Sequence, residues 1–370
     1  MKKLLVVLLM LGLLVPVAMV ALGDSDIDLA SPHDAGSVLV RWRGEPEVTA
    51  HVASDIGPPE LRIQRIRVPD VAEAIEALRR NPHVLYAEPN YMVEAQVVPN
   101  DPLFDQLWGM ENIKAPAAWD IATASDVSFI GIDTGLDYNH PDLIANVWTN
   151  RGEVPGNGKD DDGNGYVDDV YGIDAYNGDS DPMDDYYHGT HTLGTVGAVG
   201  DNGLGVVGVN WDITFGACKF LNASGSGYTA GAVECITYAV NEGFTISNNS
   251  WGGGGYSQAL YDVIEWAGAN GHLFVAAAGN SWRDIDEIPF YPASYDLDNL
   301  ISVAAIDVND NMASFSNWGV GSVDLGAPGV NVLSTALNGT YVAKSGTSMA
   351  APHVAGAAAL LWSYHPDWTF

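Results

Sequence analysis

The amino-acid sequence predicts an α/β fold in which a small α+β domain precedes a larger domain built on a doubly wound, mainly parallel sheet. Two observations lead to this prediction. From residue 127 onward, short apolar strands alternate with glycine-rich turns and helical stretches. Residues 24–98 differ, because they hold 7 of the 15 basic residues and few glycines. With 47% hydrophobic and 17% charged residues, the chain as a whole is expected to fold.

The first 23 residues have the parts of a secretory signal peptide. Two lysines precede an apolar run over residues 4–22, which ends in small residues. A membrane anchor is the alternative, since the run approaches spanning length, but Pro16 interrupts it and no basic cluster follows. We therefore expect residues 1–23 to be a signal peptide, the protein to be secreted, and no stable membrane anchor to be present.

Residues 24–98 are expected to form one mixed domain with a boundary near residue 98. Asp70 has the sequence context of a helix N-cap, and Glu73 is placed to complete a capping box. The helix that follows repeats apolar residues at i, i+4 and i+7, namely Val71, Ile75 and Leu78. Strands are predicted around this helix over residues 37–42, 61–68, 83–86 and 91–95.

The larger domain is predicted to begin with a strand and to alternate strands with helices. The expected strands are 127–132, 214–221, 245–248, 272–278 and 300–305, and the expected helices are 188–199, 229–242 and 257–270. In parallel sheets of this kind, functional residues lie beyond the carboxyl ends of the strands. The residues at those ends are therefore the candidates for a site.

The charge and the cysteines limit the function further. After residue 98 the chain holds 34 acidic and 6 basic residues, which is a net charge of −28. Such a surface repels nucleic acid and anionic lipid, and it favours solubility or bound cations such as Ca²⁺. Cys218 and Cys235 are too few for a disulfide scaffold, and whether they are paired or free stays open at this stage.

Four short motifs carry chemically capable side chains. Asp133 follows a buried strand in Asp-Thr-Gly, and His188-Gly-Thr-His191 enters a helix rich in small residues. Ser348 in Gly-Thr-Ser-Met-Ala-Ala-Pro-His begins a second such helix, and Asn280 follows a strand in Ala-Ala-Ala-Gly-Asn. A serine nucleophile needs a base, a carboxylate that orients the base, and a donor for the tetrahedral oxyanion. The sequence holds all four parts.

With these motifs in the order Asp, His, Ser, the chain resembles the subtilisin-like serine proteases, the subtilases, and among them the thermitase-like members. The resemblance implies a catalytic triad of Asp133, His188 and Ser348, with Asn280 as oxyanion donor. His191 and His353 would then be structural. It also implies a secreted, monomeric endopeptidase that cleaves protein or peptide substrates through an acyl-enzyme. Residues 24–98 would be a self-processed propeptide that inhibits the enzyme, although an accessory domain on a linker is the alternative.

Substrates of the family bind as an added strand between two edge segments. The matching segments here are glycine-rich, and the residues that would contact substrate are Gly225, Ser226, Gly227, Ser250, Trp251 and Gly252. Both segments could instead be plain loops. Trp251 and the wall from Ala277 to Gly279 would border the primary specificity pocket, which suggests a broad or apolar preference.

An acidic stretch between Asp133 and His188 predicts a Ca²⁺ loop. Its oxygen-bearing residues stand at positions 1, 3, 5 and 9 of an EF-hand-like pattern, at Asp160, Asp162, Asn164 and Asp168. Tyr171 stands at position 12, where a bidentate glutamate is normal, so we expect another carboxylate, Asp169, to complete the site. A merely solvated acidic loop is the alternative. The resemblance also implies a second Ca²⁺ site, at Asp101, Asp142 and Asn202.

The end of the chain departs from the family pattern. Family members continue beyond the serine helix, so residues 99–370 are expected to be a catalytic domain without its C-terminal part. Two other functions are alternatives to a protease. One is an inactive subtilase-like binding module, which would need a damaged triad, and the other is a secreted Ca²⁺-binding structural protein, which repeats of the acidic loop would favour. The sequence shows neither feature.

Overall fold

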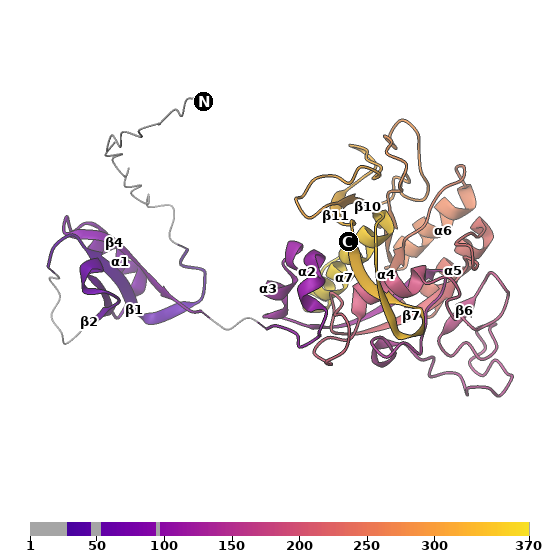
Figure 1. The fold of residues 1–370 in the computed structure, drawn as a ribbon, viewed down its shortest axis with the longest axis horizontal. Helices are drawn as coiled ribbons and strands as arrows, with labels where there is room; N and C mark the ends of the chain where they lie inside the picture. The colour runs from indigo at the N-terminus through magenta and orange to yellow at the C-terminus, as the bar shows by residue number, and fades with distance from the viewer. Residues whose placement is uncertain (1–27, 46–52, 94–96, 370) are drawn as a thin grey trace, which may run out of the picture. The chain divides into compact units, whose positions relative to one another are not determined.

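A computed structural model of the chain describes residues 28–45, 53–93 and 97–369 (Figure 1). The chain divides into two compact units between Ala95 and Gln96, and each is described here by itself. The expected signal peptide lies outside the described residues. Within the described ranges, none of the helices combines the length and the apolar character that crossing a bilayer requires.

The N-terminal unit is a four-stranded antiparallel sheet with one helix. The strands pair in the order β2-β3-β1-β4, with β1 at His33–Trp42, β2 at Ala53–Ile56, β3 at Ile63–Arg67 and β4 at Val84–Tyr91. A short 3-10 turn, η1, spans Pro59–Leu61. The helix α1 spans Val71–Arg79, and Asp70 caps it by accepting a 2.8 Å hydrogen bond from the Glu73 amide. Its buried Val71 and Ile75 complete a small core with strand residues such as Val38 and Val40.

The prediction of two strands after this helix was wrong. A single strand, β4, runs through Glu88, Pro89 and Asn90, which lie between the two predicted strands. Proline removes a backbone donor and is tolerated only where no partner needs that donor. Because β4 is an edge strand that pairs with β1 alone, Pro89 fits opposite Val38 without breaking the sheet.

The larger unit contains a seven-stranded sheet in which every neighbouring pair is parallel. The order is β11-β10-β9-β8-β5-β7-β6, and the strands span Ala124–Asp133 (β5), Gly172–Asp174 (β6), Asp212–Lys219 (β7), Ile246–Asn249 (β8), Leu273–Ala277 (β9), Leu300–Ile306 (β10) and Leu325–Pro328 (β11). The five predicted strands and the parallel sheet are confirmed. The edge strands β6 and β11 were not predicted, because glycine, aspartate and proline interrupt their apolar residues.

Helices cover both faces of this sheet, as a doubly wound fold requires (Figure 1). Helices α4 (His188–Gly197) and α7 (Thr347–Tyr364) share one core with residues such as Phe129 and Phe215. Helices α5 (Thr229–Asn241) and α6 (Gln258–Ala269) share the other core with Ile130 and Phe274. The remaining elements are short: α2 (Trp108–Asn112), α3 (Ala115–Trp119), η2 (Phe104–Gln106), η3 (Ile144–Asn146), η4 (Leu337–Gly339) and the hairpin of β12 (Val332–Ala336) and β13 (Thr340–Lys344).

The two cysteines form a disulfide. Cys218 lies near the end of β7 and Cys235 lies on α5, with their Cα atoms 5.5 Å apart. Both residues are fully buried in the core beneath α5 and α6. The bond therefore joins the sheet to the helix that covers it, and it resolves the question that the sequence left open.

Candidate active site

Asp133 and His188 meet at the carboxyl edge of the parallel sheet. Asp133 is the last residue of β5 and is almost fully buried, and His188 is the first residue of α4. Nδ1 of His188 lies 2.7 Å from Oδ1 of Asp133. A proton on Nδ1 is donated to the carboxylate in this geometry, which leaves Nε2 as the atom that can accept a proton from another group.

The charge state of His188 follows from two opposing effects. Burial lowers the pKa of His188, but the charge of Asp133 and its hydrogen bond raise it, as does the charge of Asp184. The net result is a pKa raised above the usual 6.5. One helical turn further on, His191 bonds to the carbonyl of Val342, and burial lowers its pKa to about 4. Of the two histidines in the motif, only His188 is therefore arranged to hold a proton near neutral pH.

Ser348 lies in the first turn of α7 and is joined to Ser250. Its hydroxyl donates to the Ser250 carbonyl over 3.0 Å, and the Ser250 hydroxyl donates to the Ser348 carbonyl over 2.9 Å. Among the described residues, Ser348 Oγ is therefore bonded to Ser250 rather than to His188. Catalytic hydrogen bonds of this kind are often long or absent without substrate and form in the substrate complex.

Asn280 follows β9 and is held by the residue next to Ser348. Its Oδ1 accepts two hydrogen bonds from Thr347, one from the amide at 2.8 Å and one from the hydroxyl at 3.0 Å. Within the described ranges no residue accepts a hydrogen bond from its Nδ2 group, so this group can donate to a substrate. An amide donor beside a serine is what a developing oxyanion requires.

Asn317 holds the loop that carries Asn280, and no sequence motif indicated it. This buried side chain donates to the Ala278 carbonyl over 2.8 Å and accepts from the Ser281 amide over 3.0 Å. It therefore fixes the backbone on both sides of Asn280. Gly279 is required beside it, because φ is +99° there and an added Cβ would overlap the Asn317 side chain.

Asp184 performs a similar task for the aspartate and histidine. This buried carboxylate accepts the Thr134 hydroxyl over 2.9 Å on one oxygen, and the Thr190 amide and hydroxyl over 2.9 and 2.6 Å on the other. Thr134 follows Asp133, and Thr190 lies in the first turn of the His188 helix. Asp184 thereby ties the end of β5 to the start of α4. A lone aspartate four residues before a histidine gives no signal in the sequence.

An open cleft of about 520 Å³ runs beside His188. Six of the residues predicted to contact substrate line it, namely Gly225, Ser226, Gly227, Ser250, Trp251 and Gly252. Tyr186, Tyr228 and Tyr291 also line it, and no motif had indicated them. Ala277 and Gly279, predicted as the opposite wall of the primary pocket, are not among its lining residues.

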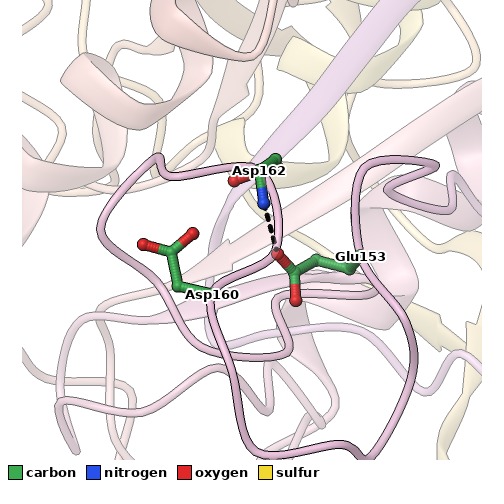
Figure 2. A group of neighbouring side chains, drawn as sticks. All are labelled: Glu153, Asp160 and Asp162. Atoms are coloured by element: carbon green, nitrogen blue, oxygen red, sulfur yellow. Dashed lines mark hydrogen bonds between the residues drawn. The ribbon is translucent and has the colours of Figure 1, made fainter.

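The acidic loop between β5 and α4 gathers three carboxylates (Figure 2). Oxygens of Glu153, Asp160 and Asp162 lie within 4.8 Å of one another. Glu153 is buried and accepts the amides of Asp161 and Asp162 over 2.8 and 3.3 Å, the second of which Figure 2 shows. The sequence pattern missed Glu153 because it lies outside the run of alternating oxygen ligands.

The other residues predicted for this loop form hydrogen bonds with the loop backbone and with members of the carboxylate group. The Asp168 carboxylate accepts hydrogen bonds from the backbone amides of Asn157 and Gly158. The backbone amide of Asn164 donates to Asp162, and its side-chain amide donates to Asp162 and Asp169. Asp169 lies beside Asp162, because the side-chain amides of Asn150 and Asn164 each donate to both carboxylates, and its role in completing the site stays a prediction. Asp169 lies fully buried under α5, where the Tyr238 hydroxyl donates to it over 2.7 Å.

Asp101, Asp142 and Asn202 meet at the loop after α4. Asn202 Nδ2 donates to Asp142 over 2.7 Å, and Asp101 accepts the Asp201 amide over 2.8 Å. The other oxygen of Asp101 is buried without a hydrogen-bond partner. Burial raises the pKa of both carboxyl groups, and the negative charge of Asp142 raises that of Asp101 further. An unpartnered carboxylate oxygen in such a place favours a cation.

Two family patterns match the chain. Residues 128–370 match the subtilase family, and residues 47–90 match the fervidolysin N-terminal prodomain. The first match covers the larger unit from β5 onward, and the second falls within the N-terminal unit.

Individual proteins agree with these matches. The chain is 38% identical over 319 residues to a thermophilic serine proteinase of Bacillus sp. (strain AK1), covering 86% of this chain and 73% of that one. It is 39% identical over 266 residues to thermitase of Thermoactinomyces vulgaris, covering 72% and 85%. A crystal structure of a cold adapted subtilisin-like serine proteinase superposes with a TM-score of 0.54 at 32% identity, covering 67% of this chain and 79% of that one.

Proposed function

The chain belongs to the subtilase family of serine endopeptidases, and from that membership we propose that Asp133, His188 and Ser348 are its catalytic triad and Asn280 its oxyanion donor. The observation that carries this proposal is the 2.7 Å hydrogen bond between His188 and Asp133. His188 and Ser250 line the same cleft, and the Ser348 hydroxyl donates a hydrogen bond to Ser250. A binding module without catalysis would not need this arrangement.

Each group has one task in the proposed reaction. Ser348 Oγ attacks the carbonyl carbon of the scissile peptide bond while its proton passes to His188 Nε2. Asp133 holds the imidazole in the required tautomer and stabilises the imidazolium. Asn280 Nδ2 donates to the oxyanion of the tetrahedral intermediate. His188 then protonates the leaving amine, an acyl-enzyme remains on Ser348, and water activated by His188 releases the second product.

We propose the domain roles that the sequence suggested: a signal peptide at residues 1–23, an inhibitory propeptide at 24–98 and a catalytic domain at 99–370. The match to a protease prodomain supports the second role, since such a domain implies an interaction with its own protease. Self-cleavage would fall between about Ala95 and Pro99. Secretion and a monomeric state belong to the same proposal, as does cleavage of protein or peptide substrates.

Calcium is the cation that the two acidic groups fit best. Ca²⁺ takes about six to eight oxygen ligands, and both groups offer only carboxylate and amide oxygens. Glu153, Asp160 and Asp162 would hold one ion, with Asn164 and Asp168 of the same loop as further proposed ligands. At the second site, the unpartnered oxygen of Asp101 would be a Ca²⁺ ligand together with Asp142 and Asn202. Bound there, the ion supplies charge neutralisation and structural stability.

Labelling of the nucleophile tests the proposed function directly. The full-length protein would be treated with a serine-directed fluorophosphonate, and the adduct would be mapped by mass spectrometry. We expect one adduct, on Ser348, which is absent from Ser348→Ala and greatly slowed in His188→Ala. Labelling elsewhere, or none in a folded protein that is free of its propeptide, would refute the proposal.

A further inference from the structure

Phe290 lies between the two segments predicted to form the walls of the primary specificity pocket. One wall is Ser250–Gly252 and the other is Ala277–Gly279. A Cβ added to Gly252 would overlap ring atom Cε1 of Phe290, and a Cβ added to Gly279 would lie 2.9 Å from the same atom. One aromatic ring therefore packs directly on the backbone of both walls.

The backbone around Phe290 is fixed to the first wall. The Gly253 amide donates to the Tyr291 carbonyl over 2.8 Å, so residues 290 and 291 run beside the Ser250–Gly252 segment. The Phe290 amide donates to the Ser294 hydroxyl over 3.0 Å. These two hydrogen bonds set the position from which the side chain extends between the walls.

The ring itself is held from its outer side. The Arg283 guanidinium lies over the ring, 5.6 Å from its centroid, which is the geometry of a cation–π contact. The side chain is only partly exposed. Moving the ring away would lose this contact and the packing on both glycines, so the ring is expected to stay in place when substrate binds.

The shape of the cleft agrees with a filled pocket. Its lining includes Ser250 to Gly254 on one side but neither Ala277 nor Gly279 on the other. The open space of this cleft thus runs along the first wall and is not bordered by Ala277 or Gly279 of the second.

We propose that Phe290 restricts the residue on the acyl side of the scissile bond to a small side chain, such as that of glycine, alanine or serine. This inference rests on the proposed function, because it takes the two walls to be the primary pocket. It replaces the broad or apolar preference expected from the sequence with a narrower one. A phenylalanine or leucine of the substrate would have to occupy the space that the Phe290 ring already fills.

Peptides that differ only in the residue before the scissile bond test the proposal. For alanine, leucine and phenylalanine at this position, kcat/KM would be measured on the full-length, self-processed protein. We expect kcat/KM for alanine to exceed that for phenylalanine by about tenfold or more. In Phe290→Ala the ratio should move toward phenylalanine by about 10- to 100-fold, while the alanine substrate changes little. Phe290→Val should give an intermediate ratio.

Trp282→Ala is the matched control, because Trp282 is a half-exposed aromatic residue of the same loop and none of its atoms is among the nearest neighbours of a Cβ added to either glycine. It should leave the preference unchanged. Equal rates for alanine and phenylalanine in the unaltered protein, or an unchanged ratio in both Phe290 variants, would overturn the inference. If the protein reacts with the fluorophosphonate and cleaves peptides, these results refute only the role proposed for Phe290. If it does neither, the proposed function fails instead.

Discussion

The sheet edge with Asp133, His188 and Ser348, which we propose to be catalytic and call the catalytic edge, and the acidic loop of residues 150–171 are built in opposite ways. At the catalytic edge, Asp133, His188 and Ser348 each lie at the end or the beginning of a strand or helix, and the backbone places the side chains. In the acidic loop the side chains place the backbone. Asp160 accepts the amides of Gly163 and Gly165 over 2.6 and 3.0 Å, and Glu153 accepts two further amides.

This difference indicates which property each region controls. Regular elements packed on both faces of a sheet fix atoms closely, which a reaction requires. A loop organised around its own carboxylates accumulates negative charge, and a cation would relieve it. We therefore expect changes at the catalytic edge to affect rates with little loss of stability, and changes in the acidic loop to affect stability with little loss of rate.

The largest expected effect is at the nucleophile. Ser348→Ala should lower kcat by a factor on the order of 10⁶, and His188→Ala by nearly as much, because the two act as one unit. The double variant should lose hardly more than either one. Steady-state kinetics on the three variants check this, with circular dichroism to confirm that each is folded. Losses that simply multiply would show that the two residues do not act together.

The next largest effect is at the oxyanion donor. Asn280→Ala should lower kcat by about 10²–10³, a range established on subtilisin itself. Asn317→Ala should lower kcat by less, because it displaces Asn280 without removing it. If Asn317 acts through Asn280, adding Asn317→Ala to Asn280→Ala should cost little more. A full additional loss in the double variant would mean that Asn317 acts through general stability.

The pH profile should reveal the charge around His188. Since the base must be neutral and its pKa is raised above 6.5, kcat/KM should fall with decreasing pH from above that value, by about tenfold per pH unit. The charge of Asp184 is one cause of the raised pKa. Removing it in Asp184→Asn destabilises the imidazolium, so the acid limb should move to lower pH.

Asp137→Asn is the control for this measurement. Asp137 is also a buried carboxylate that accepts backbone amides, those of Asn139 and Asn338, but it is not among the groups with the largest effects on the pKa of His188. The acid limb of the kcat/KM profile in Asp137→Asn should stay at the pH found for the unaltered protein. An unchanged limb in Asp184→Asn, or the same shift in both variants, would contradict the role given to Asp184.

The smallest effect on rate is expected in the acidic loop. Chelation of Ca²⁺ should lower Tm, because a ligand that binds only the folded state stabilises it, and each kcal/mol lost corresponds to about 2–4 °C. Glu153→Gln should remove part of this dependence and leave kcat/KM within about twofold. Asp161→Asn, from the same loop but outside the carboxylate group, should retain it. A Tm of the unaltered protein that does not respond to Ca²⁺ would refute the cation proposal.

The sequence predicted those features that local patterns encode. The five predicted strands of the parallel sheet follow from apolar runs, and the motifs around Asp133, His188 and Ser348 are contiguous in the chain. Local patterns could not predict Asn317 and Phe290, because both contact segments that are distant in sequence. They could not predict Glu153 either, because it lies outside the acidic motif. The edge strand β4 was missed for a related reason. Whether Pro89 ends a strand depends on how many neighbours that strand has, which only the assembled sheet shows.

The disulfide has a consequence for the unfolded chain. Cys218 and Cys235 lie 17 positions apart, and the segment between them contains the cleft-lining residues Gly225 to Gly227. Closing a loop of this length reduces the conformational entropy of the unfolded state, which is worth about 3 kcal/mol. The stabilisation is gained without any contact to substrate. A reductant would remove it, so we expect the larger unit to unfold more readily in reducing surroundings than in oxidising ones.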